Sequence, residues 1–449
     1  MNIESPVAAT ATSYITDEMK SDLDAVIKAI PPSQLVSPDH QVPGMDPEVS
    51  CDPYTHFKSL RDRMGEVLEY RDGMYGDVSV YNVFGHDLSK PNFCVLGYDL
   101  IRQMCMDKES FINREAYGMH TKAQSDFPLV NEMDGDDHRL TRGLFDREVF
   151  SKQHMIDFSD QTISPMADFL TKRIAAKLEA GEAAELCRDL ALPLLYSSMA
   201  RIVGVPLVDL TYFVDMGERA FGASRDPQAA YAAVQELAAF FTEKYHERKA
   251  GGDLDSGDLM SMMAKAERNG RSFSDAEIIA YCRFLLPGGI ETTWRQTANV
   301  CYAMMTNPDA YAEVVADPSL IPAAIEEACR WLASGFVVPR IAARDTELGG
   351  VAIPAGSSMV GIFGVANRDE RIWDRPDDFD LHRARKAHLT FSVGSHICMG
   401  QHLARQSLAG ALTAMVNNLP GMKLACEPAD IQLTGFQIRC PERVPVTAA

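Results

Sequence analysis

The 449-residue sequence lacks several features that assign a chain to a class of protein at once. None of its ten cysteines forms a Cys-x-x-Cys pair, and their spacing is irregular, so neither a zinc ribbon nor a disulfide framework is indicated. We see no internal repeat and no low-complexity linker. We therefore expect one domain whose cysteines are reduced thiols, as in a cytosol.

Long apolar runs are also missing. Residues 1–20, MNIESPVAATATSYITDEMK, are polar and acidic, without the basic start and apolar core of a signal peptide. The most apolar long stretch, residues 190–208, is interrupted by Arg201 and falls short of a bilayer span. We expect a cytoplasmic protein that does not interact with a membrane.

Positive charge is scarce. The 43 Lys and Arg residues are outnumbered by 63 Asp and Glu residues, which gives a net charge of −20. Such a balance argues against nucleic acid and anionic membranes as partners. Hydrophobic residues make up 46% and charged residues 24% of the chain, which suits a globular protein with a large core.

Apolar spacing of helical period dominates the middle of the chain, and strand-like patterns occur toward both ends. Residues 67–70 and 78–84 read as a strand pair, whereas residues 108–133 read as a loop. The sequence predicts a mainly α fold with small β-sheets (α+β): an irregular lead-in over residues 1–50 and a single domain over residues 51–449. The strongest helical patterns span residues 52–65, 184–204, 228–252 and 275–306.

One cysteine differs from the other nine. Cys398 lies in FSVGSHICMGQHLAR, residues 391–405, between Gly394 and Gly400, and an apolar pattern of helical period follows it. A sulfur at a helix N-terminus faces unpaired N–H groups and the positive end of the helix dipole, which favour the thiolate. A shielded, hydrogen-bonded thiolate is the kind of axial ligand that donates electron density to haem iron.

This segment resembles the haem-binding signature of the cytochromes P450. The matching positions are Phe391, Gly394, His396, Cys398, Gly400, Leu403, Ala404 and Arg405. The resemblance covers about residues 50–445 and implies the P450 fold with haem b (iron protoporphyrin IX) bound. It also implies that Cys398 ligates the iron, that Phe391 packs beside the sulfur and that His396 contacts a haem propionate.

The segment LLPGGIETTWRQ, residues 285–296, lies inside the predicted helix over residues 275–306. Gly288 and Gly289 each weaken a helix by about 1 kcal/mol relative to alanine, and Pro287 by about 3 kcal/mol. This pattern predicts an opened helix that lines a cavity; the alternative is an ordinary kink with a solvated Glu291. By resemblance, Gly288 and Gly289 form the oxygen-binding groove, and Glu291 and Thr292 are the acid–alcohol pair that delivers protons. Pro287 departs from the family pattern.

Two further segments carry candidate haem contacts. In GDDHRLTRG, residues 135–143, His138 and Arg142 are four residues apart on a helix that the preceding aspartates would cap. An exposed basic face is the alternative, but the resemblance assigns both to a propionate. In VVPRIAARD, Arg340 resembles the arginine that pairs with the other propionate, with Arg344 as a nearby competitor.

Glu327 and Arg330 lie three residues apart in EEACR. From the spacing alone they form a weak surface pair. In the family, an ExxR pair of this kind is a buried structural lock completed by a basic residue of a later segment. Asp378 stands where an arginine is common, so the third member remains open among Arg375, His382 and Arg383.

Family position also suggests a substrate pocket, although several of its residues fit an ordinary core equally well. The candidates are Leu286, Ile290, Thr293, Phe336, Val337, Val338 and Phe436. Because they are mainly apolar, we expect a hydrophobic small-molecule substrate: a terpenoid, alicyclic, steroid-like or aromatic compound.

The resemblance implies a monooxygenase that inserts one atom of O₂ into its substrate. Because no flavin- or nicotinamide-binding segment follows the haem region, we expect electrons from NAD(P)H through a ferredoxin reductase and a ferredoxin that docks near Arg139, Arg142 and Arg405. We expect a monomer.

Three alternatives are a peroxide-driven peroxygenase or decarboxylase, a haem-based gas sensor and a homologue without haem. The acid–alcohol pair argues against the first, and the lack of a signalling or DNA-binding segment argues against the second.

Overall fold

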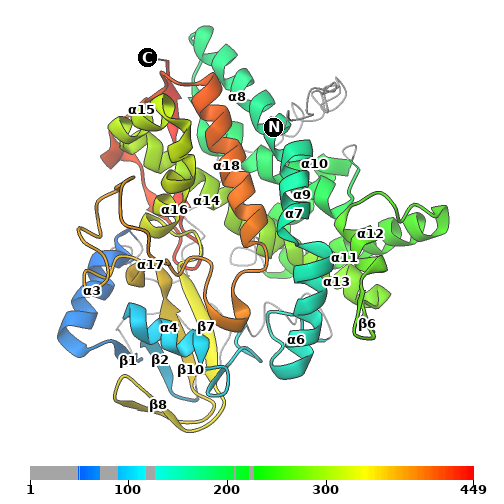
Figure 1. Ribbon diagram of the computed structural model, residues 1–449, viewed down its shortest axis with the longest axis vertical. Coiled ribbons are helices and arrows are strands. Elements are labelled where there is room, and N and C mark those ends of the chain that lie inside the picture. Colours follow the sequence, from blue (N-terminus) through cyan, green and yellow to red (C-terminus); the bar gives the residue numbers. More distant parts are fainter. Residues whose placement is uncertain are drawn as a thin grey trace, which may run out of the picture.

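The computed structural model describes residues 49, 51–70, 89–117, 127–206, 209–221 and 227–448, and helices dominate it (Figure 1). The expected lead-in over residues 1–50 lies almost wholly outside the described residues. The α-helices are α3 (Pro53–Met64), α4 (Tyr98–Met106), α6 (Gly135–Leu144), α7 (Lys152–Phe158), α8 (Ser164–Glu179), α9 (Leu192–Val203), α10 (Leu210–Phe221), α11 (Pro227–Gly251), α12 (Leu259–Lys265), α13 (Asp275–Leu285), α14 (Thr292–Thr306), α15 (Pro308–Ala316), α16 (Ile321–Trp331), α17 (Phe363–Ala366) and α18 (Gln401–Asn418). Four π-helical segments adjoin them: η3 (Phe145–Val149), η4 (Ser159–Ile163), η5 (Cys187–Ala191) and η8 (Leu286–Glu291).

A five-stranded sheet lies apart from most of the helices (Figure 1). Its strand order is β1 (Val67–Glu69), β2 (Asn92–Val95), β10 (Ser358–Ile362), β7 (Val337–Ala342) and β3 (Phe111–Ile112). β2 and β10 run parallel, and the other neighbours are antiparallel. The smaller sheets are β11 (Lys423–Leu424) with β14 (Pro445–Thr447) and β4 (Ala184–Glu185), β12 (Leu433–Thr434) with β13 (Cys440–Pro441), β5 (Glu267–Arg268) with β6 (Arg271–Ser272), and β8 (Thr346–Leu348) with β9 (Val351–Ile353).

The mainly α fold with small sheets is confirmed. The strand expected over residues 67–70 is present as β1, which ends at Glu69 and pairs with β2; residues 78–84, its expected partner, lie outside the described residues. The expected loop over residues 108–133 contains the short strand β3, and residues 118–126 of it are not described.

Local sequence explains where the central helix begins. Ser274 accepts a hydrogen bond from the backbone N–H of Glu277, whose carboxylate accepts one from the backbone N–H of Ser274 (2.8 Å). This capping box satisfies two of the unpaired N–H groups at the start of α13. The helix expected over residues 275–306 therefore begins at Asp275, as predicted.

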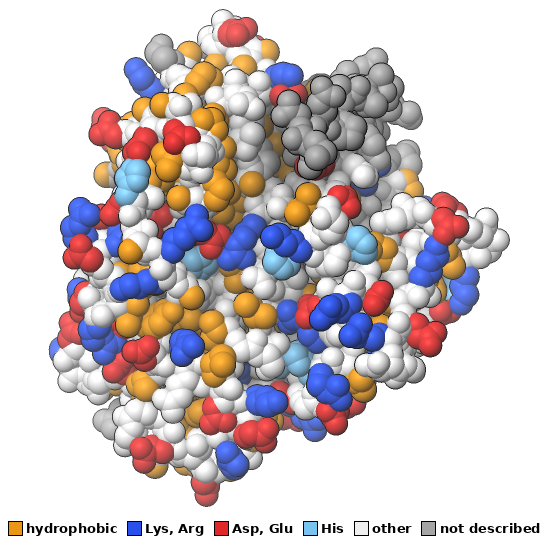
Figure 2. Space-filling model, in the orientation of Figure 1, with side chains coloured by type: hydrophobic (Ala, Val, Ile, Leu, Met, Phe, Trp, Pro, Cys, Tyr) orange, Lys and Arg blue, Asp and Glu red, His pale blue; other side chains and the backbone are white. Residues whose placement is uncertain are grey.

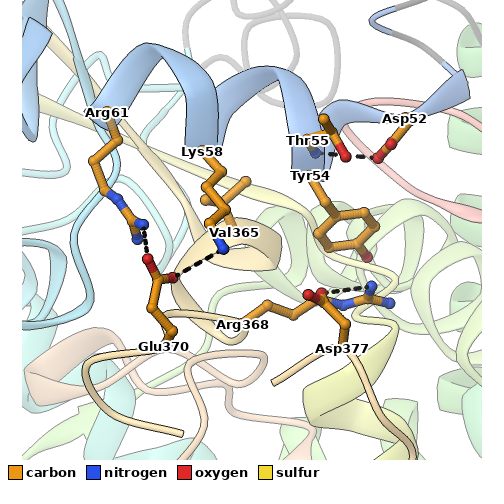
Figure 3. A pocket seen from close by; sticks show the side chains of 9 residues that line it. All are labelled: Asp52, Tyr54, Thr55, Lys58, Arg61, Val365, Arg368, Glu370 and Asp377. Atoms are coloured by element: carbon orange, nitrogen blue, oxygen red, sulfur yellow. Dashed lines mark hydrogen bonds and ion pairs between the residues drawn. The ribbon is translucent and has the colours of Figure 1, made fainter. Parts of the chain in front are cut away.

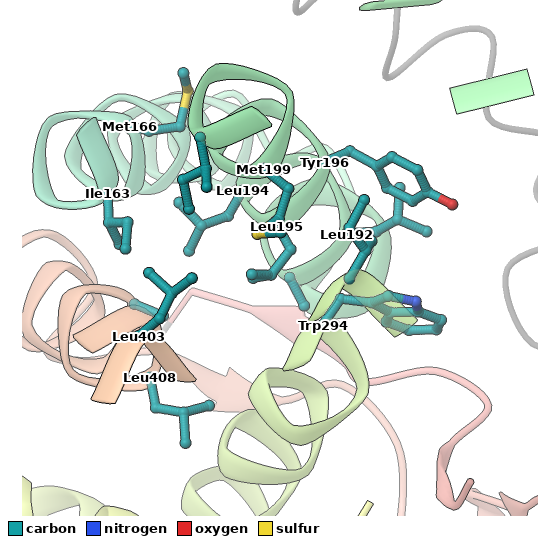
Figure 4. Packing of buried hydrophobic residues seen from close by; sticks show 14 of the residues in the cluster. Ile163, Met166, Leu192, Leu194, Leu195, Tyr196, Met199, Trp294, Leu403 and Leu408 are labelled. Atoms are coloured by element: carbon teal, nitrogen blue, oxygen red, sulfur yellow. The ribbon is translucent and has the colours of Figure 1, made fainter. Parts of the chain in front are cut away.

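The largest hydrophobic core lies where α8, α9, α14 and α18 meet (Figure 4). α14 is buried along nearly its whole length, so its side chains pack on several sides at once. Figure 4 shows Leu192 and Met199 of α9 beside Trp294 of α14, with Leu403 and Leu408 of α18 facing Leu194 and Ile163. This packing fixes α14 relative to α18, the helix that follows Cys398.

Among the described residues, no helix combines the length and apolar character that crossing a membrane requires.

Candidate active site

Cys398 lies in a tight loop just before α18. Its backbone N–H donates to the carbonyl of Phe391 (2.7 Å), which closes the loop, and Gly400 is the N-cap of the helix. Gly394 has a φ of +80°, and a Cβ there would lie 2.6 Å from the carbonyl oxygen of Cys105. Only glycine therefore lets the loop adopt this conformation and pass close to the end of α4.

The helix terminus alone does not ionise the sulfur. Desolvation by the surrounding protein raises the pKa of the Cys398 thiol; the backbone N–H of Gly400 and the charges of Arg142 and Arg405 only partly oppose that rise. The N–H at the helix N-terminus does favour the thiolate, as expected, but burial outweighs it in the protein by itself. A bound metal cation would supply the missing stabilisation, because it deprotonates a coordinating thiol.

Two buried nitrogen donors near this loop have no hydrogen-bond partner among the described residues: His138 Nε2 and Arg340 Nη2. His138 lies on α6 with its ring 4.0 Å from that of His396, centroid to centroid. Arg340 lies on β7 and is 1% exposed, and its Nη1 donates to the carbonyl of Pro339 (2.7 Å). Buried polar groups almost always have partners, so these two atoms indicate a place for an acceptor.

The charges around these donors suit an anion. Burial, the charge of His396 and that of Arg142 lower the pKa of His138 to about 4, so this imidazole is neutral at pH 7. Burial and the charge of Arg340 also lower the pKa of His396, although Asp134, 3.8 Å from its Nε2, opposes them. The guanidinium of Arg340 then provides the positive charge, and the two imidazoles provide neutral polar groups.

Arg142 has partners other than those expected. Its Nη1 donates to the carbonyl of Ile397 (2.7 Å), and its Nε donates to Asp146 (2.7 Å). It therefore braces the residue just before Cys398. These two bonds use Nε and Nη1, and the expectation that Arg142 and His138 act together on one propionate stays a prediction.

Asp134 has a role that sequence reasoning missed. It is the N-cap residue of α6, yet its side chain makes no capping bond to that helix. Its carboxylate instead accepts the backbone N–H groups of Asn113 (3.1 Å) and Arg114 (2.9 Å) and lies beside His396. These bonds lower the pKa of Asp134 against the opposing effect of burial. They also hold three distant segments together at the candidate site.

The glycine–proline segment forms the π-helical η8 over Leu286–Glu291, between α13 and α14. The opened helix predicted from Pro287, Gly288 and Gly289 is thus present. Beyond it, Thr292 Oγ1 donates to the carbonyl of Gly288 (3.0 Å), and Ser334 Oγ donates to the carbonyl of Thr292 (2.9 Å). π-Helical turns of this kind are frequent at functional sites.

Glu291 does not face solvent. It is 4% exposed, and its carboxylate accepts from Trp294 Nε1 (3.2 Å) and from Arg295 Nε (3.1 Å) and Nη2 (3.0 Å). The alternative of a solvated Glu291 is therefore wrong, whereas its role in proton delivery stays a prediction. The signal was in the sequence, because Glu291 and Arg295 are four residues apart on one helix.

Comparisons with known proteins agree with this geometry. The model of the cytochrome P450 family matches residues 221–420. Nocardicin C N-oxygenase of Nocardia uniformis subsp. tsuyamanensis is 34% identical over 70% of this chain and 78% of its own length, and the putative cytochrome P450 YjiB of Bacillus subtilis is 30% identical over 73% and 81%. The chain is a cytochrome P450. A steroid C26-monooxygenase of Mycobacterium tuberculosis is 30% identical over 69% of this P450 and 82% of that enzyme.

Solved structures support the same assignment. The P450 CYP109Q5 from Chondromyces apiculatus has a TM-score of 0.76 and 25% identity, over 90% of this chain and 97% of that one. CYP109B1 from Bacillus subtilis has a TM-score of 0.73 and 26% identity, over 89% and 100%. This P450 is accordingly a monooxygenase, and its family implies a haem cofactor.

The residues present fit that cofactor. Haem needs one thiolate from the protein, which Cys398 would supply. Its propionates need hydrogen-bond donors, and the unpartnered His138 Nε2 and Arg340 Nη2 could donate to them. Within the described part of the chain, no group of three or more His, Cys, Asp or Glu side chains is arranged to hold a metal ion without a porphyrin.

The Glu327–Arg330 pair is buried in this P450, and its third member is Arg383. Arg330 Nε and Nη2 donate to the two oxygens of Glu327 (2.9 and 2.7 Å), and Arg383 Nε donates to Oε1 (2.9 Å). Arg330 also donates to the carbonyls of Asn367, Pro376 and Asp378. The pair thus fastens α16 to the segment before the cysteine loop.

The expected pocket residues belong to separate parts of the core. Leu286 and Ile290 of η8 lie in the large core, Val338 lies in a core between α4 and the five-stranded sheet, and Thr293 is buried. Phe336 and Phe436 pack their rings together (5.5 Å), and Phe57 of α3 lies 5.6 Å from Phe436. Phe336 and Phe436 thus belong to a core between α3 and the five-stranded sheet, with Val337 at its edge, and the assignment of these residues to a pocket stays a prediction.

The expected basic docking patch is more neutral than its sequence suggested. Arg139 pairs with Asp136 (3.1 Å), Arg142 with Asp146 (2.7 Å) and Arg405 with Glu326 (2.6 Å). On the face that carries α18 and α6, Figure 2 shows Lys and Arg side chains in a band across the middle, with acidic groups among them.

A charged cavity of about 230 Å³ lies beneath α3 (Figure 3). Arg61 pairs across it with Glu370 (2.6 Å) and Arg368 with Asp377 (3.4 Å). The first pair joins α3 to the segment after α17, and the second lies within that segment. The cavity is unsuited to an apolar substrate, because charged side chains from both sides line it. Its lining comprises Asp52, Tyr54, Thr55, Lys58, Arg61, Val365, Arg368, Glu370 and Asp377.

Proposed function

We propose that this P450 inserts one oxygen atom from O₂ into an uncharged, largely apolar small molecule, with Cys398 as the thiolate ligand of haem b. The observation that carries the proposal is the pair of unpartnered buried donors, His138 Nε2 and Arg340 Nη2, close to the Cys398 loop. The charge of Arg340 acts on His396, and the charges of Arg340 and Cys398 both act on Tyr117, so these groups surround one region.

Haem, when bound, supplies O₂ binding and activation, and the protein supplies ligation, orientation and protons. Cys398 would ligate the iron and donate electron density to it. His138, His396 and Arg340 would hold the carboxylates of the cofactor. Arg142 keeps the loop in place through the carbonyl of Ile397.

Thr292 is the residue we assign to proton delivery. Its hydroxyl hydrogen is directed at the carbonyl of Gly288 (3.0 Å), which leaves the oxygen lone pairs as acceptors for water. A water held in this way is a positioned proton source. Leu286 and Ile290, which belong to the same π-helical turn, are buried and apolar.

The substrate class follows from these apolar residues. A terpenoid, alicyclic, steroid-like or aromatic compound matches the apolar character of Leu286, Ile290 and Val338, which we assign to the pocket. The names of relatives include a steroid monooxygenase and an N-oxygenase of nocardicin C, so relatives of this chain act on different molecules.

We assign electron supply to a ferredoxin and an NAD(P)H-dependent ferredoxin reductase. The band of Lys and Arg side chains on the face of α18 and α6 suits an acidic electron carrier.

One experiment tests cofactor, cavity and substrate class together. The purified haem-bound protein is titrated with a panel of apolar compounds while the haem absorption band is followed. Compounds that shift the band are then incubated with NADH, a ferredoxin and its reductase, and products are identified by mass spectrometry. Oxygenated products that require NADH support the proposal. Product formation with hydrogen peroxide alone, and none with the electron-transfer chain, contradicts it.

A further inference from the structure

Ser334 lies in the short connection between α16 and β7 and forms hydrogen bonds through three of its groups. Its Oγ donates to the carbonyl of Thr292 (2.9 Å), its backbone N–H donates to Gln296 Oε1 (2.8 Å), and its carbonyl accepts the backbone N–H of Arg439 (2.8 Å). Ser334 is 4% exposed, so leaving any of these groups unpaired would be unfavourable. This one residue therefore joins α14 to the connection before β7 and to the residue before β13.

Two amide side chains of α14 extend the same contact. Gln296 Nε2 (3.1 Å) and Asn299 Nδ2 (2.9 Å) both donate to the carbonyl of Leu332, and Asn299 Nδ2 also donates to the carbonyl of Arg439 (3.1 Å). Both amides are buried. Because a buried amide is costly unless it is hydrogen-bonded, these bonds fix where the connection lies along α14. We call Ser334, Gln296 and Asn299 the α14–β7 clamp.

The clamp joins two parts of the candidate site. α14 begins at Thr292, directly after the π-helical η8, and β7 carries Arg340, whose Nη2 we assign to a haem propionate. The π-helical turn interrupts the i→i−4 hydrogen-bond ladder, so α13 does not by itself fix the start of α14. The bond from Ser334 Oγ reaches the first residue beyond that interruption.

Thr292 is thus held at two points. Its Oγ1 donates to the carbonyl of Gly288 (3.0 Å) within η8, and its own carbonyl accepts Ser334 Oγ. A backbone carbonyl has two lone pairs, so the bond from Ser334 adds to the helical hydrogen bond and does not replace it. We propose that Ser334 is a positioning residue for proton delivery: through the carbonyl of Thr292 it fixes the Thr292 hydroxyl relative to β7. This inference rests on the role proposed above for Thr292.

The deciding experiment is a double-mutant cycle on Ser334 and Thr292 in the haem-bound protein. Product formed and hydrogen peroxide released per NADH consumed are measured with the compound that shifts the haem band most and with the ferredoxin and its reductase. Ser334→Ala should lower coupling by up to about fivefold, the factor that corresponds to one hydrogen bond of about 1 kcal/mol. In a Thr292→Ala background no hydroxyl is left to position, so adding Ser334→Ala should change coupling by less than about twofold.

A second measurement does not depend on activity. Hydrogen–deuterium exchange of the backbone amides in residues 286–296 should become faster by about fivefold in Ser334→Ala, while exchange in α8 stays unchanged. If Ser334→Ala fails to hold haem, both measurements are made on Ser334→Cys, which keeps the shape of the side chain but has a weaker donor.

Ser407 provides a matched control. It is 1% exposed, and its Oγ donates to the carbonyl of Leu403 (3.0 Å) on α18. Ser407→Ala removes the same kind of bond from another helix, so it should leave coupling and the exchange of residues 286–296 unchanged.

The outcomes separate a positioning role from a general effect on stability. Losses of coupling that multiply in the double variant would overturn the inference, because Ser334 would then act independently of the Thr292 hydroxyl. An unchanged Ser334→Ala beside an uncoupled Thr292→Ala would overturn it as well and leave the proposed function intact. Full coupling in Thr292→Ala would instead refute the proposed role of Thr292, so the two failures are read from different variants.

Discussion

The guanidinium of Arg405 lies over the ring of Phe391, with Cζ 4.2 Å from the ring centroid. Glu326 holds it there by accepting Arg405 Nε (2.6 Å) and Nη2 (3.0 Å). His388 Nε2 lies 3.2 Å from the same carboxylate, and its ring is 5.8 Å from that of Phe391. Since the carbonyl of Phe391 accepts the backbone N–H of Cys398, charges on α16 and α18 set the position of the cysteine loop.

The first prediction concerns the reduction potential of the haem-bound protein. Arg405 is one of the charges that lower the pKa of Cys398, so its positive charge stabilises negative charge near the sulfur. The same charge favours the reduced haem, which is more negative than the oxidised haem. Arg405→Met should therefore lower the haem potential, whereas Glu326→Gln, which leaves Arg405 uncompensated, should raise it. Potentiometric titration followed by absorbance measures both. Arg139→Met, at an exposed pair with Asp136, is the control. Shifts of the same sign in the two variants would contradict this account.

The second prediction is a pH dependence of stability. Burial raises the pKa of Glu326, but hydrogen bonds from His388 and Arg405 outweigh it and lower that pKa from 4.5 to about 2. Because the folded-state pKa lies below the ordinary value, this contribution is complete above pH 4.5 and is lost as the pH falls toward about 2. Denaturant unfolding between about pH 6 and pH 3 should show a shallower pH slope in Glu326→Gln than in the unaltered protein. An identical slope would count against the assignment.

The third prediction tests Arg383 as the third member of the Glu327–Arg330 lock. Arg383→Met removes the bond to Glu327 (2.9 Å) and bonds to the carbonyls of Arg375 (3.0 Å) and Asp378 (2.8 Å). The free energy of unfolding should fall by about 1–3 kcal/mol, since buried acceptors lose a charged donor. His382→Ala is the matched control: His382 is exposed and pairs with Glu313 at the surface, so its loss should cost less than about 1 kcal/mol. Equal losses in both variants would show that Arg383 has no special role.

Much of this site could be predicted because its signals are local. The capping box at Ser274, the weakened helix at Gly288 and Gly289 and the glycine-bounded loop of Cys398 each depend on a few neighbouring residues. Arg383 could be named only as one of three candidates. Which cation reaches Glu327 depends on the path of an irregular segment, and no periodic pattern describes that path.

Other features depend on contacts between distant segments. Phe336 and Phe436 read as pocket residues because they are apolar and adjoin expected site residues. The sequence does not reveal that Phe436 also packs against Phe57, about 280 positions before Phe336, so that these rings form one core. The Glu291–Arg295 pair was visible as a helical spacing, but spacing does not reveal that the pair is buried beside Trp294.

The fourth prediction concerns the sulfur ligand. Cys398→Ala should abolish the absorption spectrum typical of a thiolate-ligated haem, because its side chain supplies the ligand that we propose. Cys426→Ala should leave that spectrum unchanged, since Cys426 is a partly exposed free thiol outside the Cys398 loop. The spectrum of the reduced protein with carbon monoxide reports the ligand directly. A thiolate-type spectrum that persists in Cys398→Ala would refute the assignment.

The last prediction tests the unpartnered donor on β7. Arg340 Nη2 has no hydrogen-bond partner among the described residues, and we assign it to a haem propionate. Arg340→Met should speed the loss of haem, because an ionised carboxylate of the cofactor would lose a charged donor in a buried place. Transfer of haem to an excess of apomyoglobin measures that rate. Arg344→Met is the matched control: Arg344 follows β7 closely and donates to Ser110 Oγ (3.1 Å), so its removal should not change haem retention. Equal rates in the two variants would mean that Arg340 does not bind a haem propionate, and its buried Nη2 would then need a different acceptor.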